Sequence, residues 1–266
     1  MTDKAYVAGV GMVPFQKPGK SESYDVMATA ATRSALADAG LDYDKVQQAY
    51  VGYVYGDSTC GQRALYHVGM TGIPVLNVNN NCSTGSSALF LARQAVESGA
   101  VECALALGFE QMQPGAIGAM FHDRVSPFAA FDSETDELVG SAEIPLALRY
   151  FGGAGKAHMD EFGTPLETFA KIRAKASRHA AKNPVALFRQ EVTAEDVMAA
   201  QVVWPGVMTK LMACPPTCGA AAAIICSKEF ADKHGLDSSV RIAAQAMTTD
   251  GPETFEAHDM REVVGF

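Results

Sequence analysis

The sequence predicts an α/β fold in which a largely parallel sheet is covered by helices on both faces. Short apolar segments alternate with segments of helical periodicity from residue 5 to about residue 112, and this alternation is typical of strands joined by crossover helices. Two segments, 103–109 and 219–226, are apolar almost without interruption, as expected of strands buried on both faces. The segment between them, 113–216, has helical periodicity but no clear strand. We therefore expect a sheet interrupted by a long, mostly helical insertion.

The elements predicted before the insertion have recognisable ends. Ser23 precedes an amphipathic segment that stops at Gly40, which predicts a helix over residues 25–39 with a serine N-cap and a glycine C-cap. Gly9 and Gly11 lack the third glycine and the helix of a dinucleotide motif, so they indicate structural turn glycines. The other predicted elements are strands at 5–13, 48–55, 74–79 and 103–109, a short helix at 62–69, and a helix after Cys82 that ends at Gly99.

The insertion contains one long predicted helix, over residues 168–182, and shorter helical pieces at 145–150 and 157–161. Thr193 and Asp196 have the spacing of a capping box, which marks another helix start. Four residues of the long helix are predicted to face inward: Phe169, Ile172, Ala176 and Ala180. Such insertions often form lids and binding loops.

The sheet is predicted to resume after the insertion, with a strand at 219–226, a helix at 228–234 and a last strand at 240–247. The pattern therefore predicts three segments: residues 1–112 as the first part of the sheet domain, residues 113–216 as the insertion, and residues 217–266 as the last part of the sheet domain.

Composition narrows the function classes. The chain has 266 residues and a net charge of −9, which argues against nucleic-acid binding, because nucleic-acid interfaces are basic. No apolar run approaches the roughly 18 residues of a membrane span, and no signal peptide is expected at the start. The six cysteines lack Cys-x-x-Cys spacing, so we expect neither a disulfide framework nor a metal site. Reduced thiols in an intracellular protein are expected instead.

Cys82 is the strongest candidate for a reactive residue. It lies among small polar residues, in Asn-Asn-Asn-Cys-Ser-Thr-Gly-Ser-Ser, where a predicted strand gives way to a predicted helix. Ser83, Thr84 and Ser86 can accept hydrogen bonds from the first N–H groups of that helix. A helix N-terminus favours a thiolate by roughly 0.3–2 kcal/mol, so full activation needs a second group, usually a histidine. Placement alone leaves two interpretations open: a nucleophile, or a small buried core residue.

Residues 81–86, Asn-Cys-Ser-Thr-Gly-Ser, resemble the nucleophile motif of thiolases, and in particular the sterol carrier protein x-type, lipid-transfer thiolases. Further matches lie at 106–112 (Ala-Leu-Gly-Phe-Glu-Gln-Met), at 155–159 (Gly-Lys-Ala-His-Met), and at 214–215 with 219–223. The resemblance covers essentially the whole chain. It implies a βαβαβαββ half, packed as a layer, with a loop domain inserted.

In that family a second, similar half follows the position that matches Phe266. The second half is absent from this sequence, and with it the histidine motif, the second cysteine and most oxyanion donors. We therefore expect that this chain needs a second half or a partner subunit for catalysis. A smaller departure is Cys218, which stands before Gly219 where the family commonly has an acidic residue, and it is expected to change local hydrogen bonding.

The resemblance implies a function. Cys82 would take the acyl group from a 3-ketoacyl-CoA and release acetyl-CoA or propionyl-CoA, or would run the reverse condensation. Coenzyme A would be a substrate and product, with no tightly bound cofactor. It would lie against the insertion, with His158 and Met159 near the pantetheine arm. The family also implies a homodimer in which residues 75–79 meet their twin, and a place in the cytoplasm or in a peroxisomal or mitochondrial matrix.

The phosphates of coenzyme A have a candidate contact in the insertion. Basic residues share one face of the long predicted helix at i, i+4 spacing: Lys171, Lys175, Arg178, His179 and Lys182. The alternative is an ordinary solvated helix face.

Two other functions remain open from the sequence. One is an aldolase subunit of the same fold that cleaves steroid side-chain CoA thioesters, although a retro-aldol step needs no acyl-enzyme on Cys82. The other is a non-catalytic module that binds CoA esters or lipids.

Overall fold

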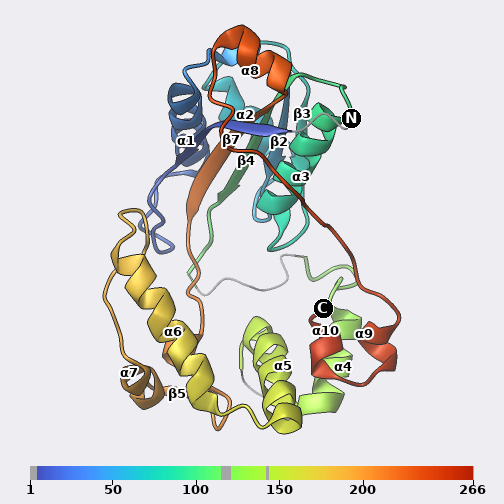
Figure 1. Cartoon of the computed structure of the whole chain (residues 1–266). Helices are drawn as coiled ribbons and strands as arrows, with labels where there is room; N and C mark the ends of the chain where they lie inside the picture. Colours follow the sequence, from blue (N-terminus) through green and yellow to red (C-terminus); the bar gives the residue numbers. More distant parts are fainter. Residues whose placement is uncertain (1–4, 115–120, 142–143, 266) are drawn as a thin grey trace. The chain divides into compact units, whose positions relative to one another are not determined.

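The computed structural model describes residues 5–114, 121–141 and 144–265, which form two compact units (Figure 1). The sheet unit comprises residues 5–114 and 217–247, and the helical unit comprises residues 121–141, 144–216 and 248–265. The last segment of the chain, which the sequence pattern groups with the sheet, thus clusters with the helical unit. Among the described residues, no helix combines the length and apolar character needed to cross a membrane.

The sheet has five strands in the order β1-β7-β4-β2-β3. They are β1 (Tyr6–Met12), β2 (Gln48–Gly52), β3 (Val75–Val78), β4 (Cys103–Glu110) and β7 (Gly219–Cys226). β2 runs parallel to β3 and β4, whereas β7 runs antiparallel to both of its neighbours, β4 and β1. The prediction of a parallel sheet is therefore wrong for β7. The reason is topological: the insertion leaves after Glu110 and returns at Gly219, and these two residues are register partners.

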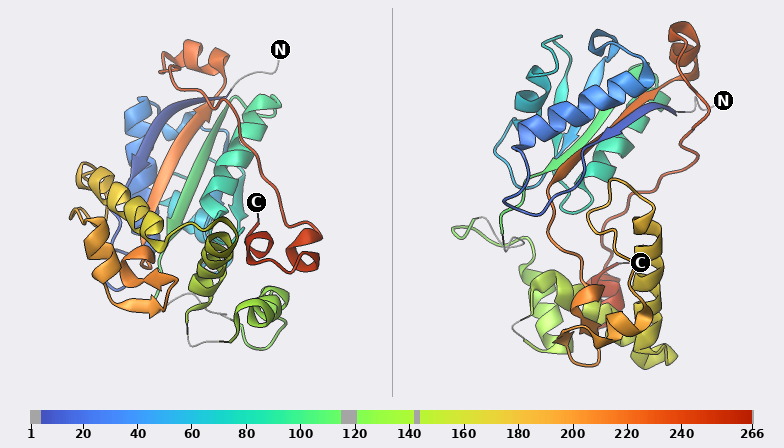
Figure 2. Two further views of the ribbon diagram at one scale, coloured as in Figure 1. Left: turned by 60° about the horizontal axis from the view of Figure 1, so that its bottom comes forward. Right: turned by 90° about the vertical axis from the view of Figure 1, so that its left-hand side faces the viewer.

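Helices cover both faces of the sheet, as predicted. α1 (Tyr24–Ala39) packs on β1, β7 and β4, and α2 (Cys60–Tyr66) packs beside α1, whereas α3 (Thr84–Glu97) packs on β4 and β2. Figure 2 shows α1 and α3 on opposite sides of the strands. Alternate residues of β4 point to opposite faces: Leu105 belongs to the core under α1 and Ala104 to the core under α3.

Two glycines of β1 let α1 approach the sheet closely. A Cβ atom on Gly11 would lie 2.3 Å from the carbonyl oxygen of Ala31 and 2.4 Å from the backbone nitrogen of Ala35. A Cβ on Gly9 would overlap Ala35 and Ala39 in the same way. Both glycines lie inside the strand, so they serve helix–sheet packing rather than the predicted turn.

Several predicted ends in the sheet unit need correction. α1 ends at Gly40, which has a left-handed backbone (φ 65°), as predicted. Ser23, however, does not cap the helix backbone, because its hydroxyl donates to the Asp25 carboxylate instead (2.6 Å). The predicted helix at 62–69 begins earlier and ends earlier, as α2. α8 (Lys228–His234) forms as expected, with the Ser227 hydroxyl accepting from the Phe230 N–H.

The strand predicted at 240–247 does not form. Its only ladder contact among the described residues is an isolated bridge between Arg241 and Tyr6. The Val7 N–H donates to the Val240 carbonyl and the Ile242 N–H to the Ala5 carbonyl, so pairing is confined to the first residues of β1. On its other edge β1 pairs with β7, and the register of that pairing shifts between Val7 and Gly9.

The helical unit contains four larger helices: α4 (Ala129–Val139), α5 (Leu146–Phe162), α6 (Leu166–Ala181) and α7 (Ala194–Ala199). Two short helices near the end of the chain, α9 (Glu253–Glu256) and α10 (Met260–Val263), belong to it too. Contrary to prediction, the insertion also has two paired strands, β5 (Val202–Trp204) and β6 (Met208–Thr209). The two helical pieces predicted at 145–150 and 157–161 are one helix, α5.

The inward face predicted for the long helix is wrong at Ile172 and Ala176, which are exposed, whereas Phe169 and Ala180 are half-buried. The buried residues of α6 are Ala170, Ala174 and Ser177, whereas Ile172 is 59 % exposed. Small side chains allow close packing here, and Ser177 Oγ accepts a hydrogen bond from the Val192 N–H (3.0 Å). The predicted capping box is present at the start of α7, where Thr193 and Asp196 exchange both hydrogen bonds.

Candidate active site

Cys82 lies between the end of β3 and the first turn of α3, and its side chain is exposed. The residue before it, Asn81, has a left-handed backbone (φ 47°), a conformation that asparagine tolerates better than most residues. The chain therefore turns sharply at Asn81 and presents Cys82 on the outside of the turn. Burial in the core, one of the two interpretations that the sequence left open, does not apply.

Short polar side chains hold this turn in place. The hydroxyl of Thr84 accepts from the Asn80 N–H (2.8 Å) and donates to the Asn81 carbonyl (2.6 Å). The amide nitrogen of the Asn80 side chain donates to the Ser87 hydroxyl, one turn into α3 (2.9 Å). Ser83 donates to the Asn80 carbonyl (2.7 Å). These hydroxyls thus fix the loop. Contrary to the prediction from the sequence, the N-cap residue Ser83 makes no side-chain capping bond to the first N–H groups of α3.

Glycines of the sheet make room for the turn. A Cβ atom on Gly52 in β2 would lie 2.7 Å from the carbonyl oxygen of Thr84, and one on Gly108 in β4 would lie 3.4 Å from Gly85 Cα. The first turn of α3 therefore sits directly on the ends of two strands. This close approach leaves the Cys82 loop little freedom to move relative to the sheet.

Glu110 organises the neighbouring loop, a role that sequence reasoning missed. Its carboxylate accepts hydrogen bonds from the N–H groups of Val54 (3.0 Å) and Tyr55 (3.1 Å), just after β2. The adjacent Gln111 accepts from the Tyr24 N–H at the start of α1 (2.8 Å). An acidic residue at the end of an otherwise apolar strand is the one signal that pointed to such a role.

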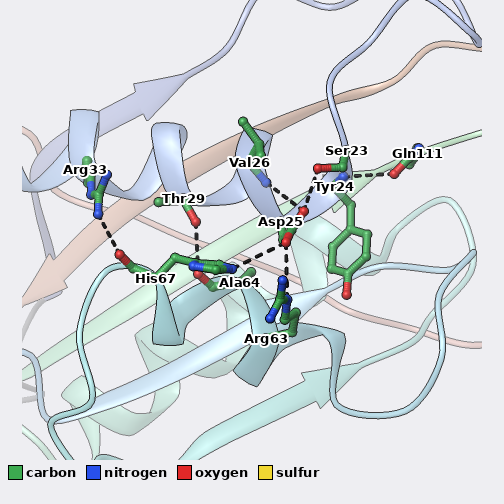
Figure 3. A network of polar contacts seen from close by, with 10 residues as sticks. All are labelled: Ser23, Tyr24, Asp25, Val26, Thr29, Arg33, Arg63, Ala64, His67 and Gln111. Atoms are coloured by element: carbon green, nitrogen blue, oxygen red, sulfur yellow. Dashed lines mark hydrogen bonds and ion pairs between the residues drawn. The ribbon is translucent and has the colours of Figure 1, made fainter.

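A charged network joins α1 to α2 in the sheet unit (Figure 3). The Asp25 carboxylate accepts from the Ser23 hydroxyl (2.6 Å) and from Arg63 Nε (3.2 Å), and lies 3.4 Å from the His67 ring. The hydrogen bond from Ser23, with the nearby Arg63 guanidinium, holds the pKa of Asp25 below its usual value. Arg33 donates to the His67 carbonyl (2.6 Å). This network fastens one helix to the next.

The other thiols are less suited to nucleophilic chemistry. Cys103 and Cys226 are directly opposed on β4 and β7 and fully buried. Burial raises the pKa of Cys103, and raises that of Cys226 to about 11. Cys218 is buried too, and its sulfur accepts a hydrogen bond from the Met112 N–H (3.2 Å). This bond joins the segments of chain that lead into and out of the insertion. Cys60 is also buried, so Cys82 and Cys214 are the two exposed thiols.

The five candidate ligand-binding residues lie in the helical unit, not in the unit that carries Cys82. His158 and Met159 are half-buried on α5. The His158 ring packs against Phe162 (4.8 Å between centroids), and its Nδ1 is buried with no hydrogen-bond partner among the described residues. No cluster of metal-ligating side chains occurs in the described part of the chain.

The three basic candidates are exposed on α6. Lys171 and Arg178 line a hollow of about 340 Å³ whose other side is formed by residues 191–194. Lys175 is not part of its lining, and Glu191 is. Lys171 also pairs with Glu167 on its own helix (3.0 Å). The structure thus brings together two of the three cations, with a carboxylate beside them.

Comparison with known proteins identifies the family. The family model described as "Thiolase, N-terminal domain" matches residues 5–203. Sterol carrier protein 2 of Oryctolagus cuniculus is 49 % identical over 270 residues, which cover 99 % of this chain and 49 % of that protein. Benzoylsuccinyl-CoA thiolase subunit BbsB of Thauera aromatica is 32 % identical, with 94 % and 62 % covered. The chain thus spans about half the length of the sterol carrier protein relatives it matches.

Solved structures share the fold. The Ltp2-ChsH2(DUF35) aldolase superposes with a TM-score of 0.70 at 21 % identity, covering 88 % of this chain and 58 % of that one. Human mitochondrial 3-ketoacyl-CoA thiolase in complex with CoA superposes with a TM-score of 0.65 at 20 % identity, covering 91 % and 69 %. Because the family model covers well over half of its residues, the chain belongs to the thiolase family and contains that family's N-terminal domain.

Proposed function

We propose that this chain carries the nucleophile of a thiolase-type acyltransferase that acts on 3-ketoacyl-CoA. The observation that carries the proposal is the position of Cys82: an exposed thiol on a sharp turn, at the start of α3, held by Thr84 and Asn80. Nearby positive charge of the helix end favours a developing thiolate. Family membership supports the same chemistry.

The proposed reaction begins with attack of the Cys82 thiolate on the 3-keto carbon of the substrate. The bond between C2 and C3 breaks, its electron pair leaves with C2, and C2 takes a proton to give acetyl-CoA or propionyl-CoA. The acyl group remains on Cys82 until the thiol of another coenzyme A attacks it. Within the described residues no base is hydrogen-bonded to Cys82, so the proposal requires a base from a further segment or a partner chain.

We propose that coenzyme A contacts the helical unit through His158, Met159, Lys171, Lys175 and Arg178. The hollow beside Lys171 and Arg178 supports a phosphate contact, because two cations converge there. Glu191 in the same lining weakens the attraction for an anion. Coenzyme A acts here as substrate and product rather than as a resident cofactor.

We further propose that two copies of the chain pair along β3. This strand is at the edge of the sheet, and Leu76 on it is 40 % exposed; an exposed strand edge is a ready template for pairing with another strand. Light scattering of the purified protein measures the molecular mass that checks this.

Since all six cysteines are free, a reducing compartment, the cytoplasm or an organelle matrix, fits best.

Acyl trapping tests the proposed function. The protein, together with the further segment or partner chain that supplies the base, is incubated with acetoacetyl-CoA, quenched in acid and mapped by peptide mass spectrometry, alongside Cys82→Ser and Cys214→Ser. Cys214 is the matched control, because it is the other exposed thiol. We expect an acetyl adduct on Cys82 in the unaltered protein and in Cys214→Ser, and none in Cys82→Ser. Equal labelling of Cys214, or no adduct on Cys82 at all, would overturn the proposal.

The same experiment separates the thiolase from an aldolase subunit. A retro-aldol step breaks a carbon–carbon bond without an acyl-enzyme. Cleavage of a 3-hydroxyacyl-CoA that persists in Cys82→Ser, with no adduct on the unaltered protein, would favour the aldolase.

A further inference from the structure

A short segment near the end of the chain packs on two helices of the helical unit. This strap, residues 253–263, contains α9 and α10, which contact α4 and α5. Phe255 meets Phe131 of α4 edge to face (5.1 Å between centroids). Met260 is buried and fits over Gly153 of α5, where a Cβ atom would lie 2.9 Å from its terminal methyl group. The strap is therefore part of the packing around α5.

Charged side chains fasten the strap at two points. His258 Nδ1 lies 2.9 Å from the carboxylate of Glu134 on α4, and that carboxylate is nearly buried. Arg261 binds Asp259 within the strap (Nε to Oδ2, 2.9 Å) and forms an ion pair with Glu161 on α5. The side chain of Arg261 is itself mostly buried, at 19 % exposed. Its position is thus determined by two carboxylates.

Arg261 also reaches the neighbour of His158. Its guanidinium lies over the ring of Phe162, 5.5 Å from the centroid, and Phe162 is the ring against which His158 packs. Phe162 is otherwise largely exposed. A surface aromatic ring turns readily unless something holds it, so the guanidinium is the contact that restrains it on the side of the strap.

His158 depends on that restraint. Its Nδ1 is buried without a hydrogen-bond partner among the described residues, and leaving a polar atom in this state is unfavourable. The imidazole would turn to relieve this cost if packing did not oppose it. Held as it is, the ring leaves Nε2 as the nitrogen able to meet a ligand.

We propose that Arg261 is a positioning residue for coenzyme A binding, because it fixes Phe162 and thereby the orientation of His158. This inference rests on the proposed role of His158 as a coenzyme A contact. The strap then supports the ligand-binding surface from behind, and none of its residues is assumed to touch the ligand.

The test compares Arg261→Gln and Arg261→Lys with Lys156→Gln. Lys156 is the matched control, since it is also a cation paired with a carboxylate of α5, Asp160. One readout is the NMR signal of the His158 Cε1 proton, assigned with His158→Gln. The other is the dissociation constant for coenzyme A by calorimetry. Thermal unfolding verifies that each variant is folded.

We expect Arg261→Gln to move the His158 signal and weaken coenzyme A binding about two- to fivefold, the effect of losing one cation–π contact near the surface. Arg261→Lys, which keeps the positive charge, should change the His158 signal and the coenzyme A affinity less than Arg261→Gln does. Lys156→Gln should change neither quantity. An unmoved His158 signal in Arg261→Gln would overturn the inference. If Arg261→Gln does not fold, Phe162→Leu removes the intervening ring and keeps the ion pairs, and the same shift is expected. Absence of coenzyme A binding by the unaltered protein would instead count against the proposed function, while the NMR readout still decides the role of Arg261.

Discussion

The two units hold their candidate functional residues by different means. In the sheet unit, Cys82 is fixed by short side chains that bond to neighbouring backbone, above strands whose Leu105 and Ile224 are completely buried. In the helical unit, His158 packs against the ring of Phe162, and the ion-paired Arg261 lies against that same ring near the surface. A nucleophile gains from a rigid mount. The surface around His158, which is proposed to bind a flexible ligand, tolerates side-chain contacts that change position.

The difference extends to the packing beneath. β1 meets α1 backbone to backbone at Gly9 and Gly11, so neither element can yield. At Gly153, α5 meets the flexible side chain of Met260 from the strap, which can move. Regions with few rigid contacts open locally at lower free energy than a sheet core. We therefore expect the sheet unit to tolerate less change than the helical unit.

The sharpest way to break this comparison is to make the same substitution in both units. Gly11→Ala forces a methyl group against the Ala31 and Ala35 backbone, and should lower the free energy of unfolding by about 3 kcal/mol, the upper range for overpacking. Gly153→Ala meets only the flexible side chain of Met260, at Cε (2.9 Å), Cγ (3.1 Å) and Sδ (3.4 Å), and gains helix propensity, so it should stay within about 1 kcal/mol of the unaltered protein. Hydrogen exchange resolved by peptide measures each unit separately. Similar losses for both variants would show that the two units are packed alike.

Unfolding measured as a function of acid pH compares one carboxyl group from each unit, and its expected effect is smaller than that of Gly11→Ala. The pKa of Asp25 is lowered by its hydrogen bonds in the folded chain. A carboxyl group with a lowered folded pKa stabilises the fold above its unfolded pKa of about 3.9, and this contribution is lost as pH falls through the folded pKa. Asp25→Asn should therefore cost about 1 kcal/mol at pH 7 and little at the acid end. Urea unfolding between pH 2.5 and 7 checks this.

Asp259 in the strap is the counterpart of Asp25 in the helical unit. Its pKa is also lowered, chiefly by the hydrogen bond from Arg261. Asp259→Asn should speed hydrogen exchange in α9 and α10 at pH 7 and leave the sheet amides unchanged. A loss of protection spread over both units would contradict the separation of the two packing modes.

The parts of the fold that local pattern determines were predictable. The runs at 103–109 and 219–226 are apolar because both faces are buried, and Gly40 is a glycine because its backbone is left-handed. The placement of Cys82 at a strand–helix junction followed from its small polar neighbours. The antiparallel direction of β7 was not predictable, since an apolar run carries no information about direction.

The helical unit resisted prediction because its packing uses small residues. α6 buries Ala170, Ala174 and Ser177 and exposes Ile172, the reverse of what hydrophobicity indicates. The sequence pattern predicts two helical pieces where α5 is continuous. Gly152 and Gly153, which lie between those pieces, are the positions where Trp204 and Met260 pack against the helix. The strap was missed for a related reason: its partners on α4 and α5 lie more than ninety residues away in sequence. The roles of Glu110 and Arg261 depend on such distant partners too.

A matched pair of helix caps gives an expected effect about as small as that of Asp25→Asn. Thr193 caps α7 in the helical unit and Ser227 caps α8 in the sheet unit, and each hydroxyl accepts from a backbone N–H at 3.1 Å. Replacing either by alanine should cost about 1 kcal/mol, the usual value for such a cap. If the sheet unit unfolds as one cooperative unit, Ser227→Ala should lower the protection of backbone amides from hydrogen exchange in β7 as well as in α8. Thr193→Ala should affect only α7 and the residues that pack on it, because the helical unit is joined by contacts that can adjust. Peptide-resolved hydrogen exchange distinguishes the two patterns, and a local effect at both caps would mean that α8 lies outside the rigid part of the sheet unit.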